Sequence, residues 1–267
     1  MAVRLIALDV DGTLLDPAHN LSPRTRAAIH SAQRRGVTIA LATGKLLASV
    51  QPLLADLRLS GTHITCNGAA LMAAATGAPV ATWSLSDAHV ELALAAIHDL
   101  APDMAIAWYT TDAIYTDSPW SLLDETLAAY HEPALRHVAR LDHTLPPPLK
   151  FLMTGGHARL LSLRDALRER IGSAVTVVRT TSDFVEVMAP GVSKGVALRD
   201  LAARLAIPRE AIVAIGDGEN DIALLDAAGL GIAMGNAMPA LLPHAQQTTQ
   251  SNAEDGVAHA LERLGLA

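Results

Sequence analysis

Aromatic residues and cysteine are scarce in this chain of 267 residues. Only 3% of the residues are aromatic, and Cys66 is the one cysteine. A single cysteine excludes a disulfide within the chain and suits a reducing compartment. Because Cys66 ends the apolar run that starts at His63, we expect a buried thiol in a strand and not a nucleophile.

Segments that could enter or cross a membrane are also lacking. The residues ahead of Asp9 are too few for the hydrophobic part of a signal peptide. The alanine-rich stretch from Ala69 to Trp83 is interrupted by Gly77 and Pro79, which makes it too short for a membrane span. We therefore expect a cytoplasmic protein without a membrane partner.

Positive charge is scarce and scattered. The formal net charge is −7, and no cluster of lysine and arginine stands out. This pattern excludes an electrostatic surface for nucleic acid, so no nucleic-acid partner is expected. An anionic substrate would need a positive site built locally. The sequence gives no indication of the oligomeric state.

What the chain does have is a hydrophobic content of 51%, enough for a substantial core. Its first third alternates apolar strand patterns, at residues 3–8, 37–42 and 63–66, with helical patterns at 22–35 and 46–57. This order predicts a parallel sheet covered on both faces by helices. The same alternation returns after Lys194.

The pattern changes in the middle of the chain, where helices alternate with short strands in no parallel order. We predict an α/β fold with a Rossmann-like parallel sheet core, residues 1–82 and 188–267, and an inserted α+β domain, residues 83–187. The predicted hinges are residues 78–85 and 189–191. The scarce aromatics of the insertion are expected to pack its own core; these are Trp108, Tyr109, Trp120 and Phe184.

Polar residues gather at four places where predicted strands end or a helix begins. They are Asp9 to Thr13, Ala42 to Lys45, Ser193 to Gly195 and Gly216 to Asp221. Ligands of open α/β sheets bind beyond the carboxyl ends of the strands. Each segment alone is also typical of a turn, a loop or a helix cap. The four together favour one functional site.

The acidic members of this set suit a divalent cation. Asp9 and Asp11 are two residues apart, so both carboxylates project to one side of an extended segment. Mg²⁺ prefers oxygen ligands and keeps several waters, so Asp9, Asp11 and Asp217 suffice to hold it. A cation is needed because a carboxylate and a phosphate dianion repel each other.

The remaining members suit a phosphate group. Thr43 offers a hydroxyl, Gly44 lets its N–H approach an anion, and Lys194 adds an ammonium at the start of a helix. Asn220 can donate an amide hydrogen bond to a phosphoryl oxygen. We expect Asp221 to support Lys194 or metal-bound water from behind the metal ligands.

These segments together resemble the haloacid dehalogenase-like hydrolase superfamily. Its four motifs match Asp9 to Asp16, Ala42 to Lys45, Lys194, and Gly216 to Asp221. Further stretches resemble its Cof-type phosphatase branch, which carries a large inserted cap of the C2B type; they are residues 67–69, 191–195 and 234–237. One departure is Lys45, where the family often has arginine. A guanidinium group can form two parallel hydrogen bonds to one partner, whereas the ammonium group of lysine acts as a point charge.

The resemblance implies a phosphatase mechanism. Asp9 would attack phosphorus to give an aspartyl-phosphate, and Asp11 would protonate the leaving oxygen and later activate water. Asp9, the backbone carbonyl of Asp11 and Asp217 would hold Mg²⁺. The phosphoryl group would be held by the Val10 amide, Thr43, Gly44, Lys194 and Asn220.

The expected substrate is a small phosphorylated metabolite, with sugar phosphates as the favoured class. The cap segment chosen for contact with the substrate is Ser182, Asp183 and Phe184. Two other functions stay open: a phosphomutase, which would return the phosphoryl group to a second hydroxyl, and a sensor that binds a phosphorylated ligand without catalysis. Release of free phosphate without an acceptor distinguishes the phosphatase from both.

Overall fold

A parallel sheet of five strands forms the base of the fold. The computed structural model describes residues 2–119, 121–180 and 183–267. The strand order is β14, β13, β12, β1, β2, and every neighbouring pair is parallel. The strands are β1 (Leu5–Leu8), β2 (Thr38–Leu41), β12 (Ile212–Gly216), β13 (Leu230–Ala233) and β14 (Gln247–Thr248).

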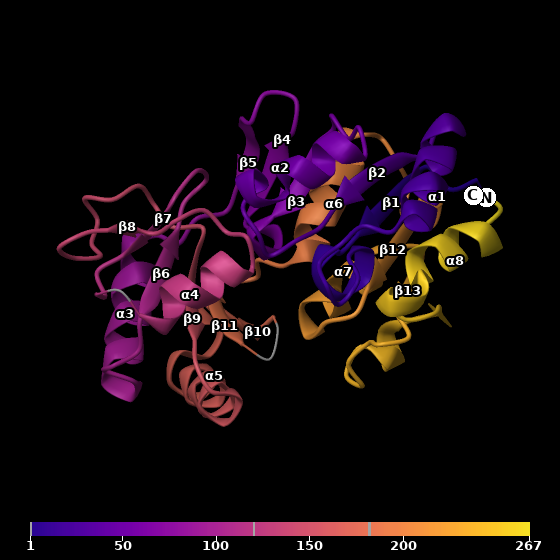
Figure 1. Ribbon diagram of the computed structural model, residues 1–267. Coiled ribbons are helices and arrows are strands. Elements are labelled where there is room, and N and C mark those ends of the chain that lie inside the picture. Colours follow the sequence, from indigo (N-terminus) through magenta and orange to yellow (C-terminus); the bar gives the residue numbers. More distant parts are fainter. Residues whose placement is uncertain (1, 120, 181–182) are drawn as a thin grey trace.

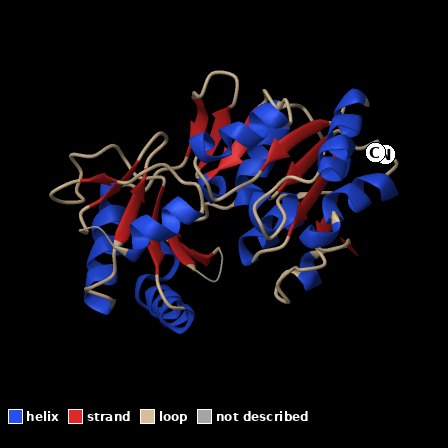
Figure 2. Ribbon diagram, in the orientation of Figure 1, coloured by secondary structure: helices blue, strands red, loops and turns tan. Residues whose placement is uncertain are grey.

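Helices cover both faces of this sheet, as the run of alternating elements predicted (Figures 1 and 2). Successive side chains of a strand point to opposite faces. Ile6 and Leu8 belong to the cluster that includes helices α1 (Pro23–Arg34), α2 (Leu47–Asp56) and α8 (Gly256–Arg263). Leu5 and Ala7 pack with α6 (Lys194–Arg204) and α7 (Ile222–Ala227). The core strands are therefore buried on both sides.

The predicted third parallel strand belongs to a different sheet, so that part of the prediction was wrong. Strand β3 (Thr62–Thr65) pairs antiparallel with β4 (Ala70–Ala73), which pairs with β5 (Pro79–Thr82). Its link to the parallel sheet is one isolated bridge between Ala42 and Ile64. The N–H of Leu41 in β2 donates to the side chain of His63 and not to a backbone carbonyl of β3, so the parallel ladder does not extend along this edge.

A second, mostly antiparallel sheet forms the inserted domain, called the cap below. Its order is β10, β11, β9, β6, β7, β8, with only β7 and β8 parallel. The strands are β6 (Ile106–Tyr109), β7 (Ile114–Thr116), β8 (Arg136–His137), β9 (Lys150–Thr154), β10 (Thr176–Arg179) and β11 (Phe184–Met188). The helices are α3 (Asp87–Leu100), α4 (Leu122–Ala129) and α5 (His157–Ile171).

The two faces of the cap sheet have different neighbours. One face carries Trp108, Phe151 and Val187 and packs with α3 and α5 in a cluster of its own. The other face carries Tyr109 and Leu152, which belong to the same cluster as the parallel sheet and α4. The cap therefore buries one face by itself and turns the other toward the core.

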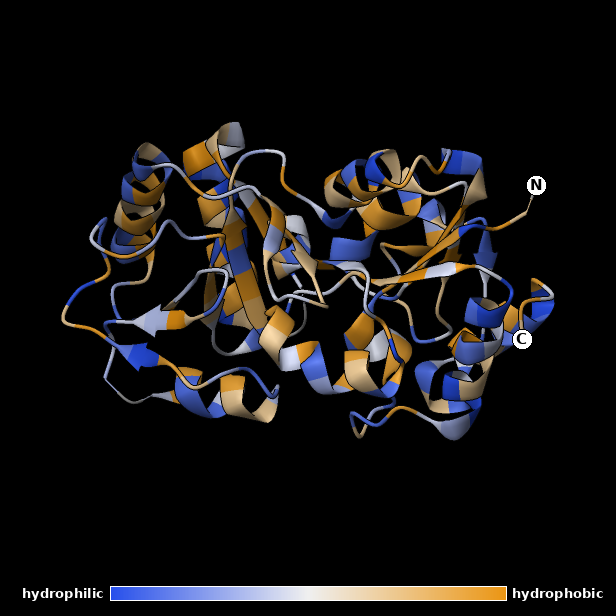
Figure 3. Cartoon of the chain, turned by 90° about the horizontal axis from the view of Figure 1, so that it is seen from above, coloured by the Kyte–Doolittle hydropathy of each residue, from blue (hydrophilic) through white to orange (hydrophobic). Residues whose placement is uncertain are grey.

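The parallel α/β core with an added antiparallel cap confirms the predicted fold class. In Figure 1 the cap sheet lies on the left, the parallel sheet on the right, and β4 and β5 near the top between them. Hydrophobic residues dominate the strands of both sheets (Figure 3). Strand β11 ends at Met188, one residue beyond the predicted cap range of 83–187, and those domain boundaries stay a prediction. No helix within the described part of the chain is long and apolar enough to cross a bilayer.

Candidate active site

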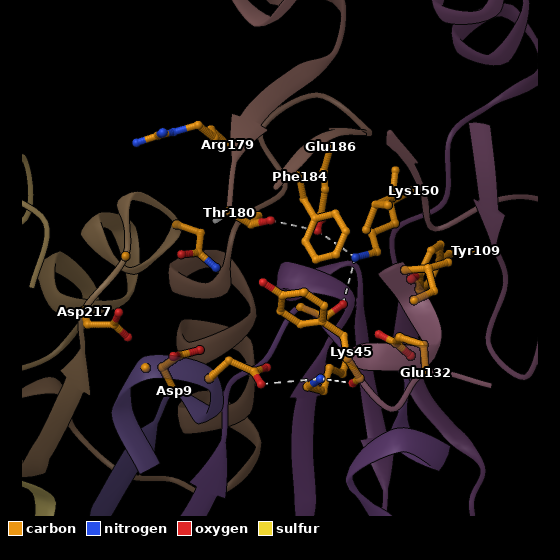
Figure 4. A pocket seen from close by; sticks show the side chains of 18 of the residues that line it. Asp9, Lys45, Tyr109, Glu132, Lys150, Arg179, Thr180, Phe184, Glu186 and Asp217 are labelled. Carbon is orange, nitrogen blue, oxygen red and sulfur yellow. Dashed lines mark hydrogen bonds and ion pairs between the residues drawn. The ribbon is translucent and has the colours of Figure 1, made fainter. Parts of the chain in front are cut away.

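The strand-end residues predicted from the sequence meet at one edge of the parallel sheet. Asp9 follows β1, Gly44 comes shortly after β2, and Asp217 follows β12, three strands that are neighbours in the sheet. They line one cavity of about 520 Å³, which extends from this edge to the cap sheet (Figure 4). The topology therefore brings together side chains that are about 200 residues apart in the sequence.

Lys194 holds two carboxylates behind the cavity. It is fully buried, and its Nζ lies 2.5 Å from Asp9 Oδ1 and 2.7 Å from Asp221 Oδ1. The second oxygen of Asp221 accepts the N–H groups of Asp217 and Gly218 at 3.0 and 2.9 Å. Asp221 is thus fully engaged in fixing its neighbours. Burial alone would lower the pKa of Lys194. The charges of Asp221 and Asp9 outweigh this effect and raise the pKa, so the ammonium group stays charged.

Asp9 and Asp217 form an acidic pair that suits a cation. Burial, the nearby carboxylate of Asp221 and that of Asp217 raise the pKa of Asp9, despite Lys194. Burial and the charge of Asp221 raise the pKa of Asp217 to about 6. One oxygen from each of Asp9, Asp217 and Asp221 lies within 4.8 Å of the others. Crowded carboxylates of this kind fit a hard divalent cation, which would favour their ionised forms.

Asp11 lies beside two groups that the sequence had not assigned to it. Its Oδ1 is 3.4 Å from Lys45 Nζ and 3.4 Å from His19 Nδ1, and it has no hydrogen bond within the described residues. Lys45 also donates a short hydrogen bond to the carbonyl of Tyr130 in the cap. The lysine that replaces the family's arginine therefore links Asp11 to the cap.

The predicted phosphate residues take different positions. Gly44 and Asn220 line the cavity, whereas Thr43 is buried and its hydroxyl accepts the N–H of Lys45 at 3.1 Å. The side chain of Val10 is buried in the core. Asn220 Nδ2 donates to Asn67 Oδ1 at 2.9 Å. The Asn220 amide is therefore oriented by a neighbour.

Asn67 is a site residue that the sequence reasoning had not assigned. Its Nδ2 donates to Glu186 Oε2 of the cap at 2.6 Å, while its Oδ1 accepts Asn220. It has a left-handed backbone, with φ of 54°, which asparagine tolerates better than most residues. An asparagine before a glycine, directly after a strand, was the available signal.

The cap supplies the far wall of the cavity. Lys150 and Glu186 form a buried ion pair at 2.8 Å, and Lys150 Nζ also donates to the carbonyl of Gly44 at 2.8 Å. Lys150 lies 4.3 Å from the ring centre of Tyr109. Figure 4 shows these side chains on the side of the cavity opposite Asp217. None of them was predicted as a site residue.

The prediction for the aromatic residues was wrong in two of its four cases. Tyr109 and Phe184 line the cavity, because the alternation of β6 and β11 turns them to the face opposite helices α3 and α5. Trp108 packs in the cap core, 5.2 Å from the ring of Phe151, as expected. Trp120 lies outside the described residues.

The cap segment chosen for substrate contact is only partly described. Phe184 lines the cavity, and Asp183 Oδ2 accepts the hydroxyl of Tyr130 at 2.9 Å. Ser182 lies outside the described residues. Of the two described residues of this segment, Phe184 is therefore the one that lines the cavity.

Comparison with known proteins identifies the family. Residues 6–261 match the family of haloacid dehalogenase-like hydrolases. The chain belongs to this family. It is 35% identical to the HMP-PP phosphatase of Cronobacter sakazakii, over 90% of this chain and 88% of that protein. It is 30% identical to the 5-amino-6-(5-phospho-D-ribitylamino)uracil phosphatase YcsE of Bacillus subtilis, over 99% and 96% of the two chains.

A solved structure of the family superimposes on nearly the whole chain. It is a haloacid dehalogenase-like hydrolase from Bacteroides thetaiotaomicron, with a TM-score of 0.84 and 29% identity, covering 98% of this chain and 99% of that one. The present chain is thus a phosphatase of the Cof type, as its sequence motifs indicated.

Proposed function

We propose that the chain is a Mg²⁺-dependent phosphatase that hydrolyses small phosphate monoesters through an aspartyl-phosphate on Asp9. The observation that carries the proposal is the position of Asp9, held by Lys194 at 2.5 Å and facing the cavity beside Asp11 and Asp217. A sensor would need the positive groups of this site but not a second acidic side chain beside the first.

The first step transfers the phosphoryl group to the enzyme. A carboxylate oxygen of Asp9 forms a bond to phosphorus, and the bond from phosphorus to the leaving oxygen breaks. Asp11 gives its proton to that oxygen, so the leaving group departs as an alcohol. Lys194 fixes the orientation of Asp9 while it attacks.

The second step returns the enzyme to its starting state. Asp11, now a carboxylate, takes a proton from water as the water oxygen bonds to phosphorus. The bond between phosphorus and Asp9 then breaks, and inorganic phosphate leaves. Asp11 is suited to both duties because its Oδ1 lies within reach of Lys45 and His19 but is not committed to a hydrogen bond.

Mg²⁺ fits the acidic end of the cavity. Asp9, Asp217 and the backbone carbonyl of Asp11 would hold it, with Asp221 fixing the loop of Asp217 from behind. When bound, the cation would offset the repulsion between the carboxylates and the phosphate dianion. Gly44, Asn220, Thr43 and the Val10 amide would contact the phosphoryl oxygens.

The proposed substrate is a small phosphorylated metabolite. Sugar phosphates are the class expected from the sequence, and the name of the Bacillus relative describes a phosphorylated ribityl chain joined to uracil. The cavity of about 520 Å³ suits a leaving group of this general size.

Phosphate release tests the nucleophile. Asp9→Asn is expected to lower Mg²⁺-dependent release from p-nitrophenyl phosphate by at least about 1,000-fold while the protein stays folded, because an amide cannot replace the attacking carboxylate. Asp16→Asn is the matched control, since the carboxylate of Asp16 accepts the N–H groups of Ala18 and Asn20 in the same segment and does not line the cavity. Release by Asp9→Asn at the wild-type rate would remove Asp9 as nucleophile. Free phosphate without an acceptor argues against the phosphomutase.

A further inference from the structure

The wall of the cavity formed by the cap contains a polar atom that makes no hydrogen bond with the described part of the chain. Tyr109 is fully buried, and its hydroxyl has no hydrogen-bond partner among the described residues. Buried hydroxyls in native proteins nearly always have a partner, so an exception needs an explanation. Because Tyr109 lines the cavity, a molecule bound there can supply the missing hydrogen bond.

Glu132 adds an acceptor to the same part of the cavity. Its Oε2 accepts a short hydrogen bond from Ser49 Oγ, and its carboxyl group lines the cavity. The backbone N–H of Leu46 also donates to this carboxyl group. A carboxylate offers about four lone-pair sites, so these two donors leave acceptor capacity for a bound molecule. Figure 4 places Glu132 near Tyr109 and away from Asp217.

The neighbouring charged side chains are already paired with one another. Lys150 Nζ contacts the Gly44 carbonyl and Glu186 Oε1, each at 2.8 Å, and lies over the ring of Tyr109. Glu186 accepts from Asn67 at 2.6 Å and from Thr180 at 3.2 Å. These groups shape the cavity but have little hydrogen-bonding capacity left for a ligand.

The part of this wall near Tyr109 and Glu132 is otherwise apolar or aromatic. The polar Thr180, Arg179 and its neighbour His157 also line the cavity, but Figure 4 places Arg179 and Thr180 away from Tyr109. Leu127 and Leu152 line the part near Tyr109, and the rings of Tyr130 and Phe184 meet edge to face with centroids 4.8 Å apart. Flat aromatic groups pack well against such rings. A sugar carries a hydroxyl on nearly every carbon, and each one buried here without a partner would weaken binding.

Building on the proposed function, we propose that Tyr109 and Glu132 bind the leaving group of the substrate, and that this group is a flat ring with a hydrogen-bonding substituent and not a polyol. The ring packs against Tyr130 and Phe184. Its substituent contacts the hydroxyl of Tyr109 and the carboxyl group of Glu132. The phosphate lies at the other end of the cavity, beside Asp9.

Three phosphate esters test this assignment: 3-aminobenzyl phosphate, benzyl phosphate and glucose 6-phosphate. The wild type is expected to hydrolyse 3-aminobenzyl phosphate with a kcat/KM about tenfold above those of the other two, since only this ester offers both a ring and a donor. Tyr109→Phe keeps the ring and removes the hydroxyl. It is expected to lower kcat/KM for 3-aminobenzyl phosphate by about tenfold and to affect benzyl phosphate less.

Tyr115→Phe is the matched control. Tyr115 lies on the neighbouring strand β7 and does not line the cavity. Its hydroxyl accepts a hydrogen bond from Arg136 Nη1 at 3.2 Å. The control should hydrolyse all three esters like the wild type. The thermal midpoint gives a second readout: Tyr109→Phe should be at least as stable as the wild type, because it removes a buried hydroxyl that has no partner.

Several outcomes would overturn the assignment. Equal losses on 3-aminobenzyl and benzyl phosphate, or a lower thermal midpoint for Tyr109→Phe, would show a structural role for the hydroxyl. Faster hydrolysis of glucose 6-phosphate than of 3-aminobenzyl phosphate would show a polyol site while leaving the phosphatase proposal intact. No release from any of these esters or from p-nitrophenyl phosphate would instead overturn the proposed function, and the leaving-group assignment with it.

Discussion

Individual residues of the active site depend on close contacts elsewhere, and Gly68 is the clearest case. It follows Asn67 in the loop after β3 and has a φ of 95°. A Cβ atom at this position would lie 2.2 Å from the carbonyl oxygen of Ser193 and 2.7 Å from the N atom of Lys194. The start of helix α6, which carries Lys194, therefore rests directly against the backbone of Gly68.

Gly68→Ala should displace the start of α6 and disturb Lys194. We expect it to lower the free energy of unfolding by at least about 2 kcal/mol more than Gly77→Ala, because the added methyl group is overpacked in a dense region. Gly77 is the matched control, with a φ of 71° and no atom within 4 Å of the added Cβ. Urea unfolding measures both variants, and equal losses would contradict the role of the contact.

At the scale of single elements, a side chain can hold two strands together, as the contact between β2 and β3 shows. Here a histidine supplies a hydrogen bond that a strand would otherwise supply: the N–H of Leu41 donates to His63 Nδ1 at 3.0 Å. His63 is fully buried, and burial lowers its pKa from 6.5 to about 4. The imidazole is therefore neutral in the folded protein at pH values where it is protonated in the unfolded chain.

This contact makes stability depend on pH. The stabilisation is complete above pH 6.5 and is lost as the pH falls toward 4, since only the unfolded chain binds the proton in that interval. Between pH 7.5 and pH 5, protonation of His63 in the unfolded chain lowers the free energy of unfolding by roughly 2 kcal/mol. His63→Asn keeps an acceptor for Leu41 and cannot be protonated. Its free energy of unfolding should fall by about 2 kcal/mol less than that of the wild type over this interval. Parallel curves for the two proteins would contradict this account.

The elements also show how far the sequence alone could go. Strands β1 and β12 and the residues after them were predictable because buried parallel strands are continuous apolar runs, and their ends carry the polar residues. The face of the cap that lines the cavity was not predictable from the sequence. Tyr109, Lys150 and Glu186 come from three strands whose order and register depend on long-range antiparallel pairing. The alternation in β9 indicates that Lys150 and Leu152 share a face, but not what that face meets.

Across the whole molecule, the buried pair of Lys150 and Glu186 joins the two parts of the protein. Both residues are on cap strands, yet Lys150 donates to Gly44 and Glu186 accepts from Asn67, and both of these partners belong to loops of the core. Asn67 continues the chain of contacts to Asn220. The position of the cap is thereby coupled to two residues proposed to contact the phosphate.

A double-mutant cycle tests this coupling. Lys150→Met and Glu186→Leu should each lower the free energy of unfolding by about 3–5 kcal/mol, because each leaves a buried charge without its partner. The double variant should be less destabilised than the sum of the two, by at least about 1 kcal/mol. Additive losses in urea unfolding would mean that the two charges do not stabilise each other.

Cys66 directly precedes Asn67, the core residue that Glu186 contacts, and it is fully buried. This burial has a practical consequence. Burial above all raises the pKa of its thiol to about 12, so the nucleophilic thiolate form is scarce at neutral pH. Alkylating dyes should therefore spare it. A cysteine introduced at the exposed Leu122 of the cap would be the one reactive thiol of an otherwise native chain, so a fluorophore placed there could report cap movement during turnover without removal of Cys66.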